Sequence, residues 1–315
     1  MKILVTGAAG FIGSNAVEAL LERGDSVRGV DCFLDYYPRE VKERNLRTAR
    51  AHEHYDFVEA DLAIADLSAL VDGCDAVLHF AAQAGVRASW GDDFRIYVDS
   101  NIHATQRLLE ACTRAGTSRL VYSSSSSIYG DAPDLPTRET TLPRPISPYG
   151  VSKLAGEHLC RLYTQANGLE TISLRYFTVY GPRQRPDMAF HRFLRAQLEE
   201  EELTLYDDGE QTRDFTFVAD AVAANLLSIE NGTPGAAYNI GGGSRVSVNE
   251  VLAMIGELSG REPRVRRHDR QKGDVRDTHA LADAAREELG WEPRTGLREG
   301  LAAELEWLRQ EVSDG

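Results

Sequence analysis

Apolar runs and amphipathic stretches alternate along the first 175 residues of the chain. Short runs rich in β-branched residues predict strands at residues 2–5, 26–30, 57–59, 76–80, 119–123 and 171–175. Helical periodicity between them predicts helices at residues 14–23, 100–115 and 152–166, and Gly24 stands where the first helix should end. Apolar strands that alternate with helices are typical of a parallel sheet covered by helices on both faces. The pattern therefore predicts an α/β fold with a doubly wound parallel sheet.

The character of the chain changes after about residue 175, where proline, glycine and charged residues become frequent and strand signals shorten. Short strands are expected at residues 203–206 and 238–240. We expect a first domain over residues 1–175 and a smaller α/β substrate-binding lobe over residues 176–315. The border is soft, because residues 215–218 are compatible with a strand that pairs back to the first domain.

Composition places the chain among ordinary globular proteins, with 42% hydrophobic and 27% charged residues in a length of 315. The formal net charge of −14 argues against a nucleic-acid partner. No apolar run approaches the ~18 residues of a membrane span, and the opening MKILVTGAAG lacks the features of a secretory signal. The four cysteines, Cys32, Cys74, Cys112 and Cys160, show no paired or metal-binding spacing. We therefore expect no metal site, reduced thiols and a cytoplasmic location.

A glycine-rich turn follows the first predicted strand and opens the first helix. Gly7, Gly10 and Gly13 are spaced GxxGxxG, which permits a tight turn and lets a phosphate approach the backbone at a helix N-terminus. The motif alone is also compatible with a plain turn. The next strand ends in Asp31, whose carboxylate can accept hydrogen bonds from both ribose hydroxyls of NAD and would repel the additional phosphate of NADP. In this context the sequence predicts a Rossmann-type NAD site, and the alternative role for Asp31 is that of a turn residue.

Two further strand ends carry candidate cofactor contacts. Asp61 follows the third strand and can reach the adenine amino group while Leu62 packs on the ring, although a helix cap is an alternative role for Asp61. Residues 80–83 end the fourth strand, and their small alanines permit close backbone approach to a cofactor or, equally, tight helix–sheet packing. The residues expected to bind the cofactor are Gly7, Gly10, Phe11, Ile12, Gly13, Asp31, Asp61, Leu62, Phe80, Ala81, Ala82, Gln83, Asn101, Ser123, Tyr149, Lys153 and Tyr176.

Tyr149 and Lys153 form a YxxxK pair, which lies on one face of a helix because the two residues are four apart. An ammonium near a phenol favours the phenolate, so we expect Lys153 to lower the pKa of Tyr149 from about 10. Such a phenol can take a proton from a sugar hydroxyl while hydride leaves the same carbon. The pair follows the serine run at residues 123–127, which ends a predicted strand. The alternative is an ordinary surface pair.

Together these motifs resemble the extended short-chain dehydrogenase/reductase family, and within it the nucleotide-sugar epimerases and dehydratases. The resemblance covers essentially the whole chain, because TGAAGFIG, VDCFLDYY, HFAAQAGVRAS, SSSSSIYG, YGVSK, RYFTVYGPRQRPDMA, DGEQTRDFTFVADA and YNIGGG occur in the family's order. HFAAQAGVRAS and RYFTVYGPRQRPDMA are most similar to the UDP-glucuronate 4-epimerase branch. Cys32 departs from the pattern, since relatives often have Asn there.

The resemblance implies reversible C4 epimerisation of UDP-glucuronate to UDP-galacturonate, with tightly bound NAD regenerated in each cycle. Tyr149 would take the proton of the sugar 4-hydroxyl as hydride passes to NAD, and the 4-keto sugar would rotate before both return to the opposite face. Ser125 would hydrogen-bond the reacting oxygen. Ser126 and Ser127 would lie toward C5 and its substituent, and a core or turn role stays open for each serine.

Residue types at the sugar end favour a uronate over other substrates. Family dehydratases carry an acid pair after the position of Ser125, and UDP-glucuronate decarboxylases carry a glutamate at the position of Ser127. A 4-keto uronate is a β-keto acid that loses CO2 readily, so small hydroxyl donors that hold the carboxylate without adding a base suit an epimerase. Thr178 joins Ser126 and Ser127 in this set, and it stands where epimerases for neutral UDP-hexoses have Asn.

The resemblance also assigns residues to the nucleotide end of the substrate. Arg213 matches the family's pyrophosphate-binding arginine, and bidentate arginines suit a dianionic diphosphate. Tyr206 lies on the strand that would grip uracil, and its alternative role is to cover the edge of the core. The residues expected to bind the substrate are Arg87, Ser125, Ser126, Ser127, Thr178, Arg185, Arg192, Leu205, Tyr206, Gln211, Arg213 and Arg276, with Arg270 as a further candidate. Arg87 and Arg185, assigned to the sugar or its carboxylate, are equally compatible with surface or interface roles.

Three alternatives to this assignment remain open on the sequence. They are a UDP-glucose/UDP-galactose 4-epimerase, a net oxidoreductase or decarboxylase on the same substrates, and a non-catalytic NAD-binding scaffold, since fold alone does not establish activity. The resemblance further suggests a homodimer formed through the helices at residues 100–115 and 152–166.

Overall fold

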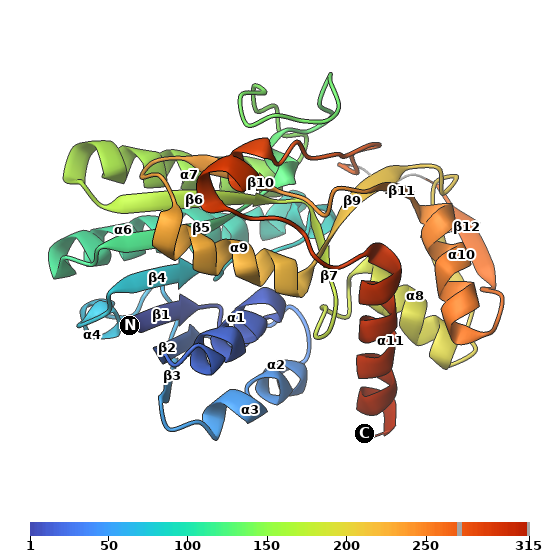
Figure 1. The fold of residues 1–315 in the computed structure, drawn as a ribbon, viewed down its shortest axis with the longest axis horizontal. Helices are drawn as coiled ribbons and strands as arrows, with labels where there is room; N and C mark the ends of the chain where they lie inside the picture. The colour runs from blue at the N-terminus through green and yellow to red at the C-terminus, as the bar shows by residue number, and fades with distance from the viewer. Residues whose placement is uncertain (270–272, 314–315) are drawn as a thin grey trace.

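A seven-stranded parallel sheet forms the centre of the molecule, with strand order β10-β6-β5-β4-β1-β2-β3. The computed structural model describes residues 1–269 and 273–313, and Figure 1 shows their arrangement. The strands of the sheet are β1 (Lys2–Thr6), β2 (Ser26–Asp31), β3 (Tyr55–Glu59), β4 (Ala76–His79), β5 (Arg119–Ser125), β6 (Glu170–Tyr176) and β10 (Ala237–Ile240). The predicted α/β class with a doubly wound sheet is confirmed.

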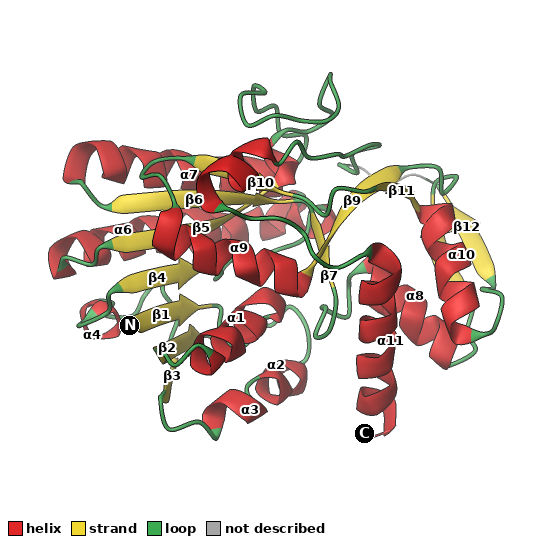
Figure 2. Cartoon of the chain, in the orientation of Figure 1, coloured by secondary structure: helices red, strands yellow, loops and turns green. Residues whose placement is uncertain are grey.

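The two faces of the sheet are buried by different helices, which explains why its inner strands β1 and β4 have no polar face. On β1, Ile3 and Val5 pack into one core with α1 and α9, whereas Leu4 packs into another core with α6 and α7. Figure 2 shows the sheet between these helical layers. The helices of this part are α1 (Phe11–Glu22), α2 (Arg39–Asn45), α3 (Arg47–Arg50), α4 (Ser68–Val71), α5 (Phe94–Tyr97), α6 (Ala104–Ala115), α7 (Pro148–Asn167) and α9 (Val218–Asn231).

A second group of elements gathers beyond the carboxyl ends of the central strands. A three-stranded sheet of order β11-β9-β7 and a pair of β12 with β8 pack with three helices around a separate apolar core. The strands are β7 (Thr178–Tyr180), β8 (Leu203–Tyr206), β9 (Thr212–Phe217), β11 (Arg245–Ser247) and β12 (Val265–His268). The helices are α8 (Ala189–Leu198), α10 (Val248–Ser259) and α11 (Leu297–Ser313).

The strand that returns to the central sheet differs from the sequence expectation. Residues 215–218 were candidates for pairing back, but β9 instead pairs with β7 and β11. The strand at 238–240, expected in the second lobe, is β10 and pairs in parallel with β6. The reason is connectivity: α9 crosses over the sheet from the second lobe and packs on α1, so the strand after α9 reaches the free edge of β6.

Helix starts also differ from the periodicity. Helix α1 begins at Phe11, directly after Gly10, because the glycine turn itself forms its first bonds. Helix α7 begins at Pro148, where the Ser147 hydroxyl accepts a hydrogen bond from Gly150 N at 3.1 Å. Serine at the cap followed by proline is a start signal that apolar spacing alone does not reveal. Tyr149 is therefore held in the first turn of α7.

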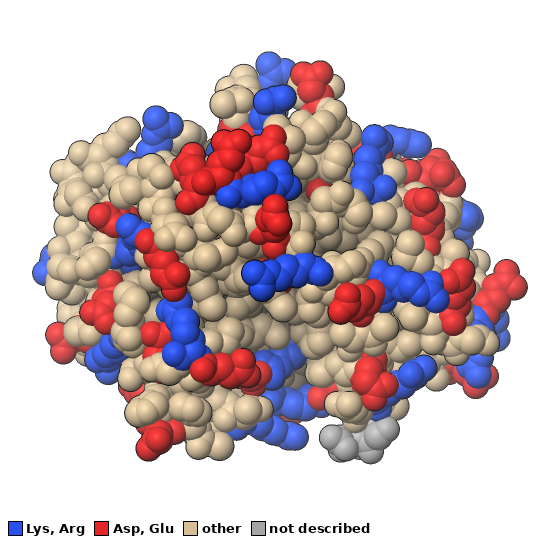
Figure 3. Space-filling model, viewed as in Figure 1, with Lys and Arg blue, Asp and Glu red and all other residues tan. Residues whose placement is uncertain are grey.

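Charges of both signs are interspersed over the face seen in Figure 3, with no large field of one sign there. Among the described helices, none is both long and apolar enough to cross a membrane. All four cysteines are free thiols, and only Cys32 is exposed.

Close packing of α7 on β5 at Gly156 gives a test of the fold. A Cβ added there would meet the Tyr122 hydroxyl at 2.1 Å and Cζ at 2.4 Å, so Gly156→Ala must push the helix from the strand. We expect a loss of about 1–3 kcal/mol in the free energy of unfolding, measured by urea denaturation. Gly296→Ala, where nothing lies within 4 Å of the added carbon, is the matched control and should change stability little. Equal stabilities of the two variants would contradict this packing.

Candidate functional site

A long cleft runs across the carboxyl ends of the central strands, and the glycine turn forms its floor. Gly7 has φ +69°, and a Cβ there would meet Ala81 N at 2.8 Å, so only glycine lets β1 and β4 approach this closely. A Cβ at Gly13 would meet Gly7 O at 2.1 Å. The N-cap of α1 is Gly10, with no side-chain cap, and Phe11 and Ile12 also line the cleft. The arrangement presents a helix N-terminus to an anionic ligand.

Asp31 lies at the end of β2, where its carboxylate lines the cleft. One carboxylate oxygen accepts a hydrogen bond from Ala9 N at 3.1 Å and the other from Phe33 N at 2.9 Å. Burial raises the pKa of Asp31, and these bonds together with the charge of Lys42 oppose the rise. The turn role that the sequence left open is therefore real, and each oxygen keeps further acceptor capacity for a hydroxyl of a ligand in the cleft.

The adenine end and the opposite wall of the cleft match the sequence prediction in part. Asp61 and Leu62 line the cleft, although Asp61 also accepts a hydrogen bond from Ala63 N at 2.8 Å, as a turn residue would. Residues 80–83 line it as well. Asn101, in contrast, is buried behind this wall, where it bonds both backbone groups of Gln83, at 2.7 and 2.9 Å. Asn101 was predicted as a cofactor contact, and the structure gives it the role of holding Gln83.

One end of the cleft, called the reactive end because the sequence predicts catalysis there, is formed by Tyr149 and Lys153 from α7, with Ser123 from β5 and Tyr176 from β6. The helix keeps the first two side chains on one face. The Tyr149 ring meets Tyr97 edge-on, with centroids 6.3 Å apart. The Lys153 ammonium is buried and lies 4.7 Å from the centroid of the Tyr122 ring. The predicted pair is thus assembled at one end of the cleft.

The charge relation within this pair differs from the prediction. Burial raises the pKa of Tyr149, while a hydrogen bond with Ser125 and the charge of Arg185 oppose the rise. Burial also lowers the pKa of Lys153 to about 8, and Cys160 and Glu157 oppose this lowering. The expected lowering of the Tyr149 pKa by Lys153 is not seen in this structure, because burial is the largest influence on both groups and Lys153 is not among the charges that act on Tyr149.

The serine run turns sharply after β5. Ser125 ends the strand, and Ser126–Ile128 form a short 3₁₀ turn against the start of α7. The Ser125 hydroxyl accepts a hydrogen bond from Ser127 N and contacts the Ser127 hydroxyl, both at 3.1 Å. Ser125 at the end of β5 is paired with Tyr176 at the end of the neighbouring strand β6. Thr178 comes two residues after Tyr176 and begins β7. Ser126, Ser127 and Thr178 are half buried and follow the ends of these two neighbouring strands, and none of the three is among the residues that line the cleft.

The candidates for the nucleotide end lie in the second group of elements. Tyr206 ends β8, and the Arg87 guanidinium lies 4.3 Å from the centroid of its ring. Arg87 also pairs with Asp274 at 2.6 Å. The Leu205 side chain is buried in the core of the second lobe and is therefore not available to a ligand. Gln211 donates to Tyr206 O at 2.9 Å, and its side-chain oxygen is buried without a donor among the described residues.

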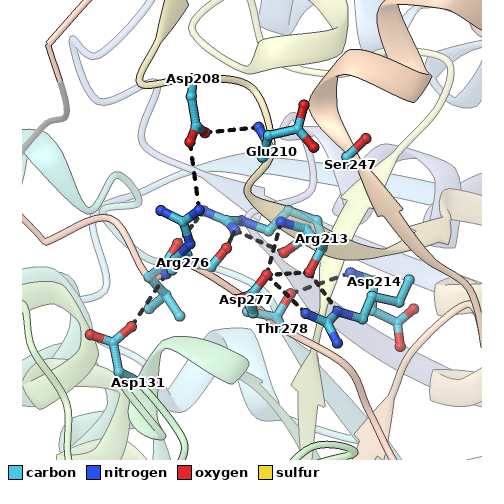
Figure 4. Close-up of polar contacts among 12 residues, drawn as sticks. Asp131, Asp208, Glu210, Arg213, Asp214, Ser247, Arg276, Asp277 and Thr278 are labelled. Carbon is cyan, nitrogen blue, oxygen red and sulfur yellow. Dashed lines mark hydrogen bonds and ion pairs between the residues drawn. The ribbon is translucent and has the colours of Figure 1, made fainter.

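Arg213 and Arg276 are brought together, as Figure 4 shows. Arg213 donates to the backbone carbonyls of Val275 at 2.5 Å and Arg276 at 2.7 Å, so it fastens this segment to β9. The Arg276 side chain is half exposed and lies 3.6 Å from Asp208. The predicted diphosphate contact of Arg213 therefore competes with a structural role that the sequence did not reveal.

The remaining arginines fall in different places. Arg192 is exposed on α8 and borders a surface hollow with Pro186 and Thr204, outside the cofactor cleft. Arg185 lines the cofactor cleft. Arg270 lies outside the described residues.

Some residues at the site were missed by the sequence reasoning. Tyr36, Tyr37 and Lys42 line the cleft. Glu157, one turn after Lys153, accepts hydrogen bonds from Ser124 at 2.6 Å and from Arg175 at 2.9 Å through both of its oxygens. Tyr36 and Tyr37 were within a quoted motif, but Glu157 left no signal beyond its i, i+4 spacing from Lys153.

Comparison with known proteins identifies the family. The model of the NAD dependent epimerase/dehydratase family matches residues 3–241, more than two thirds of the chain. The chain belongs to this family.

Individual relatives cover nearly the whole chain. The UDP-glucuronic acid 4-epimerase from Bacillus cereus, solved in complex with UDP-glucuronic acid and NAD, has a TM-score of 0.96 and 41% identity over 99% of this chain and 100% of that one. MoeE5, solved with UDP-glucuronic acid and NAD, has a TM-score of 0.90 and 44% identity over 99% of this chain and 100% of that one. YtcB of Bacillus subtilis (strain 168), an uncharacterised UDP-glucose epimerase, is 43% identical over 98% of each chain.

The cleft fits NAD on its own geometry. The glycine turn admits backbone only, as the contacts at Gly7 and Gly13 show. Asp31 supplies a carboxylate at the far end, and Lys153 supplies a buried cation at the reactive end. Among the described residues no cluster suited to a metal ion occurs.

The dependence of Lys153 on Glu157 predicts a pH effect. Removing the negative charge in Glu157→Gln should lower the pKa of Lys153 below its value of about 8. Activity that requires protonated Lys153 falls as pH rises through that pKa, so the alkaline limb of kcat/KM should move to lower pH. Glu110→Gln, which affects a carboxylate of α6 that is bonded to Tyr163 of α7 and does not line the cleft, is the control. An unmoved alkaline limb in a folded Glu157→Gln protein would contradict the coupling.

Proposed function

We propose that the protein interconverts UDP-glucuronate and UDP-galacturonate by NAD-dependent epimerisation at C4. The observation that carries the choice of substrate is the set of hydroxyl side chains at the ends of β5 and β6, next to Ser125, which hydrogen-bonds Tyr149. Ser126, Ser127 and Thr178 follow the ends of two adjacent strands, and neither Ser126 nor Ser127 is an acid or base. The likeness to the Bacillus cereus enzyme supports the same assignment.

The residues at the reactive end have separable roles. Bound in the cleft lined by the glycine turn and Asp31, NAD would supply the hydride acceptor and donor for the sugar C4. Tyr149 takes the proton of the 4-hydroxyl and gives it back, which is general base and then general acid catalysis at one oxygen. Ser125, whose hydrogen bond already opposes the rise in the Tyr149 pKa, orients that oxygen. Lys153, buried in the same part of the cleft, would hold the ribose that carries the nicotinamide.

A uronate imposes a second requirement, because the 4-keto sugar is a β-keto acid. Loss of CO2 is fast when the breaking bond aligns with the ketone π system, so the site must hold the carboxylate out of that alignment. Hydroxyl donors bind carboxylate oxygens without accepting or supplying a proton at C5. Ser126, Ser127 and Thr178 meet this need, whereas a glutamate at Ser127 would add a base.

A buried polar group without a partner among the described residues supports the assignment of the nucleotide-binding residues. The buried side-chain oxygen of Gln211, which lacks a donor among the described residues, is available to an N–H of a base placed against Tyr206. Arg276, half exposed and 3.6 Å from Asp208, is available to the diphosphate. These contacts fit a uridine diphosphate.

Neutral UDP-hexose is the second candidate substrate, and the likeness to YtcB favours it. Proton NMR of the purified protein with each sugar separates the two. UDP-glucuronate should give a mixture with UDP-galacturonate without added NAD. Turnover of UDP-glucose alone would move the assignment to the neutral hexose. Formation of UDP-xylose would mean that the hydroxyls do not protect the carboxylate. If neither sugar is turned over, the protein is a non-catalytic NAD-binding scaffold.

Removing the Tyr149 hydroxyl tests its catalytic role. Tyr149→Phe should reduce kcat by about a hundredfold or more, because the proton then lacks an acceptor, while the purified protein keeps its NAD. Tyr163→Phe, which removes a phenol from the same helix away from the cleft, should keep full activity. Turnover near the wild-type rate in Tyr149→Phe would remove Tyr149 from this role.

Substitution at Thr178 tests the basis of sugar choice. Thr178→Asn replaces a carboxylate-binding hydroxyl with an amide, so the ratio of kcat/KM for UDP-glucose to that for UDP-glucuronate should rise by about tenfold. An unchanged ratio would place sugar choice elsewhere in the site.

A homodimer through α6 and α7 is part of the proposal. Leu162 and Val151 on α7 are apolar and about half exposed, which supports a covered outer face. Leu162→Glu should therefore shift the protein in sedimentation velocity from a dimer to its 34.8 kDa monomer. Val312→Glu on α11, at an equally exposed apolar position, is the control and should remain dimeric. A monomeric wild type would contradict the dimer.

We place the protein in the cytoplasm. The free state of all four thiols supports a reducing compartment.

A further inference from the structure

A buried histidine that the proposed reaction does not use lies at the end of β4, behind the wall of the cofactor cleft. His79 is 1% exposed, and each of its ring nitrogens meets a threonine hydroxyl. Nδ1 lies 2.7 Å from Thr6 Oγ1 at the end of β1, and Nε2 lies 3.0 Å from Thr105 Oγ1 in the first turn of α6. Burial lowers the pKa of His79 to about 3, and the positive charge of Lys153 lowers it as well. The ring is therefore neutral and carries one N–H.

The hydroxyl groups on either side decide which ring nitrogen carries that hydrogen. The Thr105 hydroxyl donates to the Asn101 carbonyl at 2.7 Å, so its only hydrogen is used and its oxygen can only accept from His79. The ring hydrogen therefore lies on Nε2, and Nδ1 is left as an acceptor for the Thr6 hydroxyl. The Thr6 oxygen in turn accepts from Ala81 N at 3.2 Å. This assignment is the one that places a single hydrogen in each of these contacts.

The same hydrogen bonds connect the wall of the cleft with the helix that carries the reactive pair. Ala81, at the first end, lines the cleft. At the other end, the Asn101 carboxamide bonds both backbone groups of Gln83, another lining residue, at 2.7 and 2.9 Å. The remaining amide hydrogen goes to the Ser152 hydroxyl at 2.9 Å, and this hydroxyl donates to the Tyr149 carbonyl at 2.7 Å. We call the connected side chains the His79 network: Thr6, His79, Thr105, Asn101 and Ser152.

The His79 network is buried throughout, since each of its members is at most 1% exposed. A buried polar group that loses its partner cannot bond to solvent instead, so every hydrogen bond of the network resists change. The network joins the adjacent strands β1 and β4, which Figure 1 shows side by side, to the start of α6 and the start of α7. The wall of the cleft and Tyr149 therefore cannot shift independently while the network is intact.

We propose that His79 is a positioning residue of the epimerase reaction, which in its Nε2–H tautomer holds the cleft wall at Ala81 and Gln83 in a fixed place relative to Tyr149. The wall is part of the cleft that fits NAD, and Tyr149 is the group that handles the sugar proton. Their alignment matters because a misplacement of about 1 Å between reacting groups can cost about a hundredfold in rate. The inference rests on the catalytic role proposed for Tyr149 and not on the identity of the sugar.

Removal of one hydroxyl from the network tests its effect on catalysis. Thr105→Val keeps the shape of the side chain and leaves the His79 Nε2–H without an acceptor. We expect kcat to fall by at least about tenfold, while KM for the UDP-sugar and the NAD content of the purified protein change by less than about twofold. Deuterium at the sugar C4 should slow the variant more than the wild type, because hydride transfer becomes the slower step. A smaller fraction of folded protein would lower the rate without raising this isotope effect.

Two matched variants separate the network from general effects. Thr105→Ser keeps the hydroxyl and should retain kcat within about threefold of the wild type. Thr113→Val removes a hydroxyl from the same helix, where it donates to the Leu109 carbonyl at 2.8 Å, as the Thr105 hydroxyl donates to Asn101, but it lies outside the network. Its kcat and its isotope effect should equal those of the wild type.

The position of the ring hydrogen is read without any turnover. The full-length protein is labelled with ¹⁵N in its histidine rings, and NMR shows which nitrogen of His79 is protonated. The His79 signal is identified by its contact with the Tyr122 ring, whose centroid lies 5.8 Å away. The wild type should carry the hydrogen on Nε2. In Thr105→Val the Nδ1–H form should appear, because the Thr6 oxygen is then the remaining acceptor.

Each result decides the proposal. Wild-type kcat in Thr105→Val, an equal loss of kcat in Thr105→Ser, or a ring hydrogen on Nδ1 of the wild type overturns it. Loss of NAD from Thr105→Val with unchanged kcat after NAD is restored also overturns it, because the network would then serve cofactor binding alone. A wild type that turns over only UDP-glucose would overturn the proposed substrate, and the same kcat comparison with UDP-glucose would still decide the role of His79. If neither sugar is turned over, the proposed function and the role of His79 in it both fail, whereas the NMR spectrum still decides the tautomer.

Discussion

The buried carboxylate of Glu157 fixes the reactive end of the cleft, because it joins helix α7 to the two strands beneath it. It accepts a hydrogen bond from Ser124 on β5 and two from Arg175 on β6. Arg175 in turn bonds the Tyr129 hydroxyl at 2.7 Å and the Glu139 carbonyl at 2.9 Å. Removing one partner from such a buried pair costs about 3–5 kcal/mol, so the helix cannot rotate without losing this network. This network therefore also fixes the positions of Tyr149 and Lys153, which lie on the same helix.

The position of that helix explains why chemistry occurs at this edge of the sheet. Parallel strands bring their carboxyl ends to one side, so the glycine turn after β1, Asp31 after β2 and the serines after β5 meet the same ligand. The chain after β6 then leaves the sheet and builds the second lobe opposite this edge. A dinucleotide on the sheet and a nucleotide sugar from the second lobe would therefore meet at Tyr149.

Much of this arrangement could be predicted from local sequence, and the rest depends on contacts distant in the chain. Ile3, Leu4 and Val5 indicate a strand buried on both faces, and the glycine spacing before a helix indicates a phosphate cradle. The role of Asn101 could not be predicted, because its partners Gln83 and Ser152 come from other segments. Likewise Arg213 is directed at the carbonyls of residues 275 and 276, and no pattern around it reveals them. The YxxxK spacing predicts that Tyr149 and Lys153 meet, but not that burial dominates both pKa values.

Deuterium at C4 of the sugar tests most directly whether bound NAD and Tyr149 act together on that carbon. UDP-glucuronate labelled at C4 is converted by the purified protein without added NAD, and the product is read by NMR and mass spectrometry. The account predicts UDP-galacturonate that keeps the deuterium at C4, because the hydride leaves and returns within one closed cleft. Loss of the label to solvent would show that C4 is inverted by another route, and it would contradict the roles given to the cofactor and to Tyr149.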